Sequence, residues 1–157
     1  KIHNPETEKD RSFTLCPDAC FVLQDKSTKK QSLFFLEVDE GSETDPKRWR
    51  DKVLSYIAFW KQGGFKESFE FAGEGFRVLT VCRSETDREQ WKRKLKLLKA
   101  TFRAGGRGQF WFATFDEVMP DNAVTGEHFL TGKVWQRARE KEIKEEVKIA
   151  LDRELFT

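Results

Sequence analysis

The chain has 157 residues, a length that suits one domain. Hydrophobic residues make up 38% of it and aromatic residues 13%, so a buried core is expected. Charged residues reach 36%, but the net charge is only +2, which excludes an argument for nucleic-acid binding from overall charge. No apolar run approaches the roughly 20 residues that span a bilayer, and no signal-peptide pattern opens the chain.

Two strands are expected near the start of the chain. After a polar approach segment over residues 1–11, the loose alternation of SFTLCPDACFVLQD predicts one strand over about 12–24, interrupted at Pro17. The stretch DKSTKK indicates a turn. The continuous apolar run SLFFLEVDE ends in acids and is typical of a buried strand.

Two amphipathic helices are also predicted. The first, over about 46–62, begins at the helix-start pair Asp45-Pro46 and ends at two glycines. The second, over about 85–103, begins at the capping box formed by Thr86 and Glu89. Each helix carries an apolar stripe at helical spacing. The stripes are Trp49, Val53, Ile57 and Trp60 in the first helix, and Trp91, Leu95, Leu98 and Phe102 in the second.

The remaining segments vary in clarity. Strands are expected over 76–83 and 109–118, and a last strand or irregular segment over 129–138, whereas 65–76 is either an irregular strand or a loop. The charge-dense end of the chain predicts an amphipathic helix over 139–155. Its apolar side comprises Ile143, Val147, Ala150 and Leu151.

The order of these elements predicts an α/β fold, with a mixed sheet of four or five strands and flanking helices. The expected domain covers residues 12–138, preceded by the approach segment over 1–11 and followed by a charged helix within 139–157. Because Lys1 rather than Met opens the chain, a fragment or a processed chain is expected, with room for an upstream domain. The oligomeric state is left open.

Three cysteines indicate a reducing compartment. Cys16, Cys20 and Cys82 form no even disulfide framework, so a soluble, cytoplasmic protein is expected. Cys16 and Cys20 supply at most half of a zinc site, which takes about four ligands.

Acidic residues gather where the first two strands meet. Glu37 and Asp39 lie two apart on a strand, so both side chains leave the same face. If DKSTKK closes an antiparallel hairpin, Asp18 lies beside Glu37 and three carboxylates converge. Mg²⁺ or Mn²⁺ would relieve their mutual repulsion. The alternative is that these acids end a strand and face water.

These segments resemble a known family. Pro17-Asp18, the strand LFFLEVDEG, a polar gap and a helix with Lys and Tyr resemble the C-terminal domain of the replication-relaxation family of plasmid and mobile-element proteins. They are also similar to the PD-(D/E)XK nuclease superfamily, whose motif falls on Pro17-Asp18 and Glu37-Val38-Asp39. The resemblance covers most of residues 13–135. It implies a restriction-endonuclease-like core that acts on DNA, with a replication or transfer protein as a further partner.

The resemblance also implies a mechanism, metal-dependent phosphodiester hydrolysis. Asp18 and Glu37 would bind the metal, with Val38 offering its carbonyl, and Asp39 would join the metal or orient a water. The superfamily has lysine where this chain has Asp39, so Lys52 of the following helix is the candidate catalytic lysine. Tyr56 shares the face of Lys52. If Lys52 is only a solvated lysine, the alternative is a non-catalytic nuclease-fold module that binds DNA or a partner protein.

A run of basic residues occupies the second helix and its end, with no acid between residues 92 and 107. A face of one charge sign suits a phosphate backbone, although it also suits an ordinary solvated helix. The candidate nucleic-acid-binding residues are Lys92, Arg93, Lys96, Lys99, Arg103 and Arg107, and Lys94 belongs to the same run.

Several other activities are not supported by the sequence. His3 and His128 are the only histidines and Tyr56 the only tyrosine, whereas a tyrosine relaxase uses clustered histidines for its metal. The chain has neither a Walker loop nor a dinucleotide-binding glycine motif.

Overall fold

The structure is a computed structural model that describes residues 14–41, 46–71, 73–120, 127–146 and 148–150. Among these residues, no helix is long and apolar enough to cross a membrane. The strands are β1 (Ala19–Gln24), β2 (Gln31–Asp39), β3 (Phe76–Cys82), β4 (Phe110–Thr114), β5 (Lys133–Arg137) and β6 (Ile149–Ala150). The helices are α1 (Pro46–Lys61), α2 (Gly64–Phe69), α3 (Asp87–Arg103), α4 (Phe115–Val118), α5 (Glu127–Thr131) and α6 (Glu140–Glu145).

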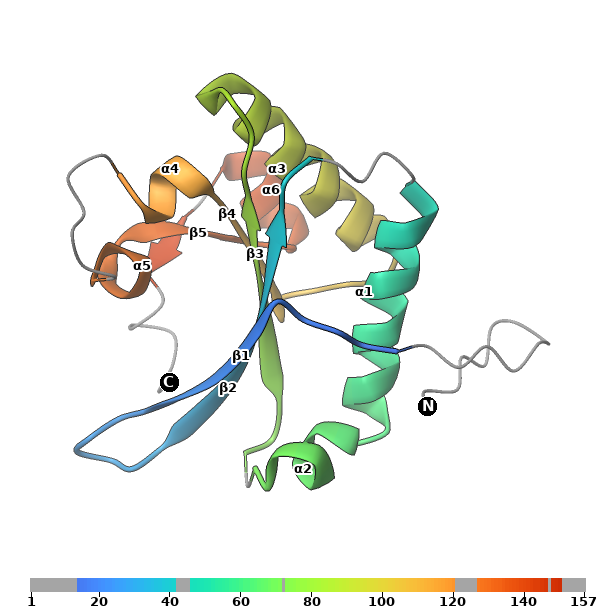
Figure 1. The fold of residues 1–157 in the computed structure, drawn as a ribbon, viewed down its shortest axis with the longest axis vertical. Coiled ribbons are helices and arrows are strands. Elements are labelled where there is room, and N and C mark those ends of the chain that lie inside the picture. The colour runs from blue at the N-terminus through green and yellow to red at the C-terminus, as the bar shows by residue number, and fades with distance from the viewer. Residues whose placement is uncertain (1–13, 42–45, 72, 121–126, 147, 151–157) are drawn as a thin grey trace.

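The strands form one mixed sheet in the order β1-β2-β3-β4-β5-β6. β1 and β2 make an antiparallel hairpin, β2, β3 and β4 run parallel, and β5 returns antiparallel to β4 (Figure 1). The parallel strands are joined by helical crossovers, as parallel pairs require. The predicted α/β class with a mixed sheet and flanking helices is therefore confirmed. Because β2, β3 and β4 run parallel, their carboxyl ends share one edge of the sheet.

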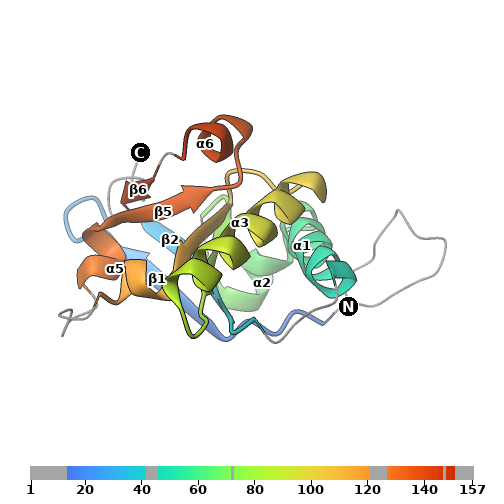
Figure 2. The ribbon, with the colours of Figure 1, turned by 90° about the horizontal axis from the view of Figure 1, so that it is seen from above.

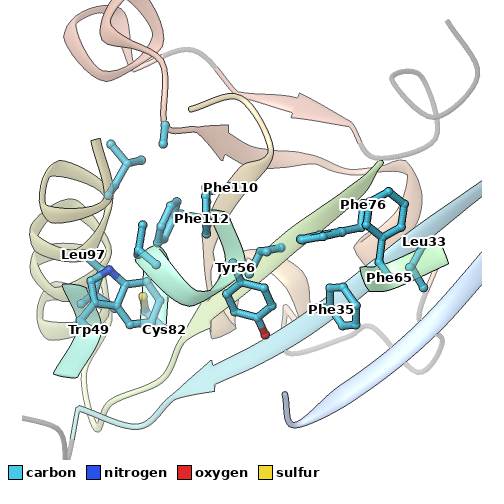
Figure 3. Packing of buried hydrophobic residues seen from close by; sticks show 14 of the residues in the cluster. Leu33, Phe35, Trp49, Tyr56, Phe65, Phe76, Cys82, Leu97, Phe110 and Phe112 are labelled. Carbon is cyan, nitrogen blue, oxygen red and sulfur yellow. The ribbon is translucent and has the colours of Figure 1, made fainter. Parts of the chain in front are cut away.

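Helices α1, α2 and α3 lie together on one side of the sheet (Figure 2). The core beneath them is strongly aromatic, and the ring of Tyr56 contacts those of Phe35, Phe76 and Phe110 (Figure 3). A hydrogen bond from Trp49 Nε1 of α1 to Thr101 Oγ1 of α3, 2.9 Å long, ties the two helices together. The other face of the sheet is also apolar and packs against α4, α5 and neighbouring side chains. The two long helices, α1 and α3, are thus joined to each other and anchored in the core.

The predicted positions of both long helices are confirmed, but their buried sides differ from the predicted stripes. In α3 the buried residues are Gln90, Lys94, Leu97, Leu98 and Thr101. Trp91 is 43% exposed, and in α1 Trp60 is 45% exposed while Tyr56 is buried. The physical reason in α3 is polar pairing, because Lys94 Nζ donates to both carboxylate oxygens of Glu117 at 2.9 and 3.1 Å. A buried lysine is tolerated when a carboxylate neutralises it, so the side of α3 that carries Lys94 faces the core.

Several predicted boundaries are wrong. β1 begins at Ala19 rather than near residue 12, because Pro17 has no N–H for a ladder. The strand predicted over 109–118 ends at Thr114, where Thr114 and Glu117 form a capping box that begins α4. The segment 65–76 contains the short helix α2, not a strand or a plain loop.

The last part of the chain also differs from prediction. The segment 129–138 divides into the end of α5 and the strand β5. The long terminal helix is replaced by α6, which stops at Glu146 with a positive φ of 53°, and then by β6. A left-handed residue at this position ends a helix. The predicted stripe residues Val147 and Leu151 lie outside the described residues.

Candidate functional site

The β1–β2 hairpin places Asp18 beside Glu37. Ala19 pairs with Leu36 across the hairpin, so Asp18 stands opposite Glu37. The backbone N–H of Asp18 donates to the Leu36 carbonyl at 3.0 Å, and Asp18 Oδ2 accepts from the Val38 N–H at 2.7 Å. The carboxylate of Asp18 is therefore held at the end of β2, next to the acids of that strand.

Glu37 is almost fully buried and has two partners on α1. Its Oε1 accepts from the Tyr56 hydroxyl at 2.6 Å, and its Oε2 accepts from Lys52 Nζ, also at 2.6 Å. Lys52 and Tyr56 are four residues apart, so one face of the helix presents both donors. Burial, followed by the negative charge of Glu37, raises the pKa of Tyr56 far above its usual value. The phenol therefore stays protonated and donates to the carboxylate.

Asp39 leaves the same face of β2 but has a different partner. Arg93 of α3 donates Nε to Asp39 Oδ2 at 2.6 Å and Nη2 to Oδ1 at 2.9 Å, a bidentate pair that is largely buried. Cys82, at the end of β3, lies beside this pair. Burial, and then the charge of Asp39, raises the pKa of the Cys82 thiol to about 12. This thiol is therefore protonated at neutral pH and is not a nucleophile.

The three predicted carboxylates, Asp18, Glu37 and Asp39, lie at the same end of β2 but do not form a ready three-ligand metal site. Within the described part of the chain, no three Asp, Glu, His or Cys side chains are grouped so that they could hold a metal ion. The reason is that Arg93 binds both oxygens of Asp39, while Lys52 and Tyr56 bind Glu37. Protein donors thus supply the charge compensation for which the sequence suggested a metal.

A cleft of about 440 Å³ opens at this end of β2. It is lined by Asp18, Glu37, Val38, Asp39, Glu40, Arg48, Trp49 and Lys52. All four residues predicted as catalytic therefore line one cavity. Arg48 and Lys52 add two cations from successive turns of α1, and Lys52 keeps 41% of its side chain exposed. The predicted site did not include Arg48, although its spacing of four residues from Lys52 is a signal that the sequence offered.

The carboxylates of the cleft suit a hard divalent cation that needs only one or two protein ligands. Mg²⁺ keeps several waters and is commonly held by one or two carboxylates, so it does not require a three-carboxylate cluster. Asp18 and Glu37 are two such carboxylates on one cleft wall. Each oxygen of Glu37 already accepts one hydrogen bond, from Lys52 or from Tyr56, so a metal bound there would share the carboxylate with these donors.

The basic run over residues 92–107 divides into residues paired within the protein, among them the exposed Arg107 beyond the end of α3, and residues exposed on one side of α3. Arg93 forms an ion pair with Asp39. Lys94 forms an ion pair with Glu117, and its side chain is only 1% exposed. Arg107 donates hydrogen bonds to the carbonyls of Phe102 and Gly106. Burial acts to raise the pKa of Glu117. The hydrogen bond from Lys148 and the charge of Lys94 outweigh burial and hold this pKa below its usual value. The exposed cations share one side of the helix and are called the basic stripe below. They are Arg88, Lys92, Lys96, Lys99 and Arg103.

The fold and the cleft together define a mixed α/β domain with an acid–lysine site at the carboxyl end of a central strand. Residues 2–72 match the family model described as replication-relaxation. The matched segment contains β1, β2 and α1, and hence Asp18, Glu37, Lys52 and Tyr56, so it supports the predicted family. No curated protein and no solved structure shows significant similarity to the chain.

Proposed function

We propose that this domain acts on DNA in the replication or transfer of a plasmid or mobile element, and that it hydrolyses phosphodiester bonds with a divalent metal. The observation that carries the proposal is the 2.6 Å contact between Lys52 Nζ and Glu37 Oε2, in a cleft that Asp18 also lines. Two carboxylates and a lysine at the tip of a strand form the working set of a PD-(D/E)XK site. The antiparallel β1–β2 hairpin and the helix that follows it support such a core.

Each residue of the cleft has a role in this proposal. Asp18 and Glu37 hold Mg²⁺ or Mn²⁺, with the Val38 carbonyl beside them. The bound cation would supply charge stabilisation at the attacked phosphate. Lys52 reaches the same cleft from α1 and stabilises charge that develops on the phosphate oxygens. Tyr56 fixes the orientation of Glu37 from within the core. Asp39, oriented by Arg93, shapes the cleft wall and positions water rather than joining the metal.

The basic stripe supplies the surface for the DNA backbone. From Arg88 to Arg103 it spans about 22 Å of helix at the usual rise per residue, and all its members are exposed. Arg93 lies next to Lys92 on α3 and reaches Asp39 at the cleft, so the beginning of the stripe is close to the cleft. Lysine and arginine side chains on such a face can contact phosphates without reading sequence.

Cleavage of supercoiled plasmid DNA in Mg²⁺ or Mn²⁺ tests the proposal. The parent protein should nick or linearise the plasmid, and Asp18→Ala, Glu37→Ala and Lys52→Met should each reduce the rate at least about a hundredfold. Lys61→Met is the matched control, since Lys61 is an exposed lysine at the far end of the same helix. Equal cleavage by the parent and all three cleft variants would show that the activity belongs to another site or to a contaminant.

A non-catalytic module is the second candidate. The observation that favours it is that both oxygens of Glu37 and both oxygens of Asp39 accept hydrogen bonds from protein donors in this structure. Such a module would bind DNA or a replication partner protein through its surface and would leave plasmid DNA intact. DNA binding by the parent without cleavage in either metal would select this candidate over the nuclease.

A further inference from the structure

Both carboxylate oxygens of Glu37 accept hydrogen bonds in this structure. Its side chain is 3% exposed, and one oxygen accepts from Tyr56 while the other accepts from Lys52. Lys52 lines the cleft together with Asp18 and Glu37, whereas Tyr56 is buried in the core, so we take the oxygen that accepts from Lys52 to be the one that a metal shared with Asp18 would bind.

The two partners differ in their freedom to move. Tyr56 is 1% exposed and its ring packs against Phe35, Phe76 and Phe110 (Figure 3). Lys52 keeps 41% of its side chain exposed and ends in a flexible four-carbon stem. Displacing Tyr56 would open the aromatic core, whereas Lys52 already lines the cleft and can rotate into it.

The charges of the two partners also differ. Tyr56 donates a neutral hydrogen bond, which is compatible with a cation on the other oxygen of Glu37. Lys52 carries a positive charge, and a divalent ion placed on the same oxygen would repel it strongly at such short range. Metal and ammonium on this oxygen therefore weaken each other's binding, and Lys52, the more exposed of the two partners, is the one that can move away.

We propose that Lys52 is an internal counter-ion that occupies the place of the divalent metal on Glu37 and is displaced when the metal binds. This inference rests on the proposed metal site at Asp18 and Glu37. The displaced ammonium then faces the cleft, where it can meet a phosphate. Lys52 accordingly weakens metal binding while it supports hydrolysis.

The test is calorimetric titration of Mn²⁺ alone into the parent, Lys52→Met, Lys52→Arg and Lys61→Met. Removing the competing charge should tighten Mn²⁺ binding by Lys52→Met at least about tenfold. Lys52→Arg keeps the charge and should bind no more tightly than the parent, and Lys61→Met should match the parent. Lys52→Met should nevertheless lose plasmid cleavage, so that metal affinity and activity change in opposite directions.

A thermal melt in Mn²⁺ provides a second readout, because a ligand that binds only the native state raises the melting temperature. The rise should be larger for Lys52→Met than for the parent at the same Mn²⁺ concentration. If parent and Lys52→Met bind Mn²⁺ equally, the competition is refuted while the metal site stands. If neither binds Mn²⁺ at millimolar concentration, the metal site and the competition both fail. If Lys52→Met binds Mn²⁺ and the parent does not, the Lys52 ammonium competes strongly with the metal, which supports the proposal.

Discussion

Arg93 of α3 and Asp39 of β2 form a bidentate ion pair across 54 residues of sequence, with N–O distances of 2.6 and 2.9 Å. The pair joins the second long helix to the wall of the cleft. It also removes from the predicted DNA-binding face a residue that the sequence could not separate from its exposed neighbours. Arg93 and the adjacent Lys92 therefore have distinct roles, the first in stability and the second on the surface.

Replacing Arg93 should destabilise the fold. Arg93→Ala leaves the buried Asp39 carboxylate without its partner, and breaking a buried ion pair in this way costs about 3–5 kcal/mol. Lys92→Ala, one residue away on the exposed side, should change the free energy of unfolding by less than about 0.5 kcal/mol. Chemical denaturation of the two variants and the parent measures both values. Similar losses for the two variants would contradict the assignment of Arg93 to the interior.

The basic stripe should govern the salt dependence of DNA binding. A triple variant in which Lys92, Lys96 and Lys99 are all changed to Glu should bind DNA more weakly. The slope of log K against log salt should fall by about 0.9 for each phosphate that the variant no longer neutralises. A control with the same change in net charge is Lys26, Lys61 and Lys66 to Glu, all exposed lysines away from α3. Fluorescence anisotropy at several salt concentrations gives the slopes. An identical slope for both triple variants would mean that net charge, not the stripe, attracts DNA.

Tyr56 and Glu37 should be coupled energetically. Tyr56→Phe keeps the ring in the aromatic core but removes a hydrogen bond to a buried carboxylate, which costs about 1.5–3 kcal/mol. In a double-mutant cycle with Glu37→Gln, the two single effects should sum to more than the effect of the double variant. Unfolding in urea supplies the four free energies. Additive effects would show that the 2.6 Å contact contributes little.

The three thiols should differ in reactivity. Cys82 is buried with a pKa raised to about 12, so it should resist a thiol reagent at pH 8, while the exposed Cys16 and Cys20 react. Burial also raises the pKa of Cys20, so labelling of Cys20 should speed up as pH rises above 8. Since the unfolded thiol ionises near 9.0, the contribution of Cys82 to stability should fall as pH rises above that value. Mass spectrometry of the labelled native protein, with a denatured control, counts the modified thiols. Rapid labelling of native Cys82 at pH 8 would refute the burial.

The sequence by itself determined the features that depend on neighbouring residues. Pro46 and Thr86 mark the beginnings of α1 and α3, since helix-start signals act within one turn. The apolar run of β2 and the turn before it place Asp18 opposite Glu37, since a hairpin brings residues of adjacent strands together.

Only the tertiary structure decided which side of α3 is buried and where the charges pair. Helical periodicity predicted Trp91 inside, yet Lys94 is buried because Glu117, 23 residues later in the chain, neutralises it. The partner of Asp39 comes from 54 residues away, so no local spacing announces it. The sequence does not distinguish a solvated lysine from a lysine that is buried in an ion pair. The energy of burying a charge depends on partners brought together only by the complete fold.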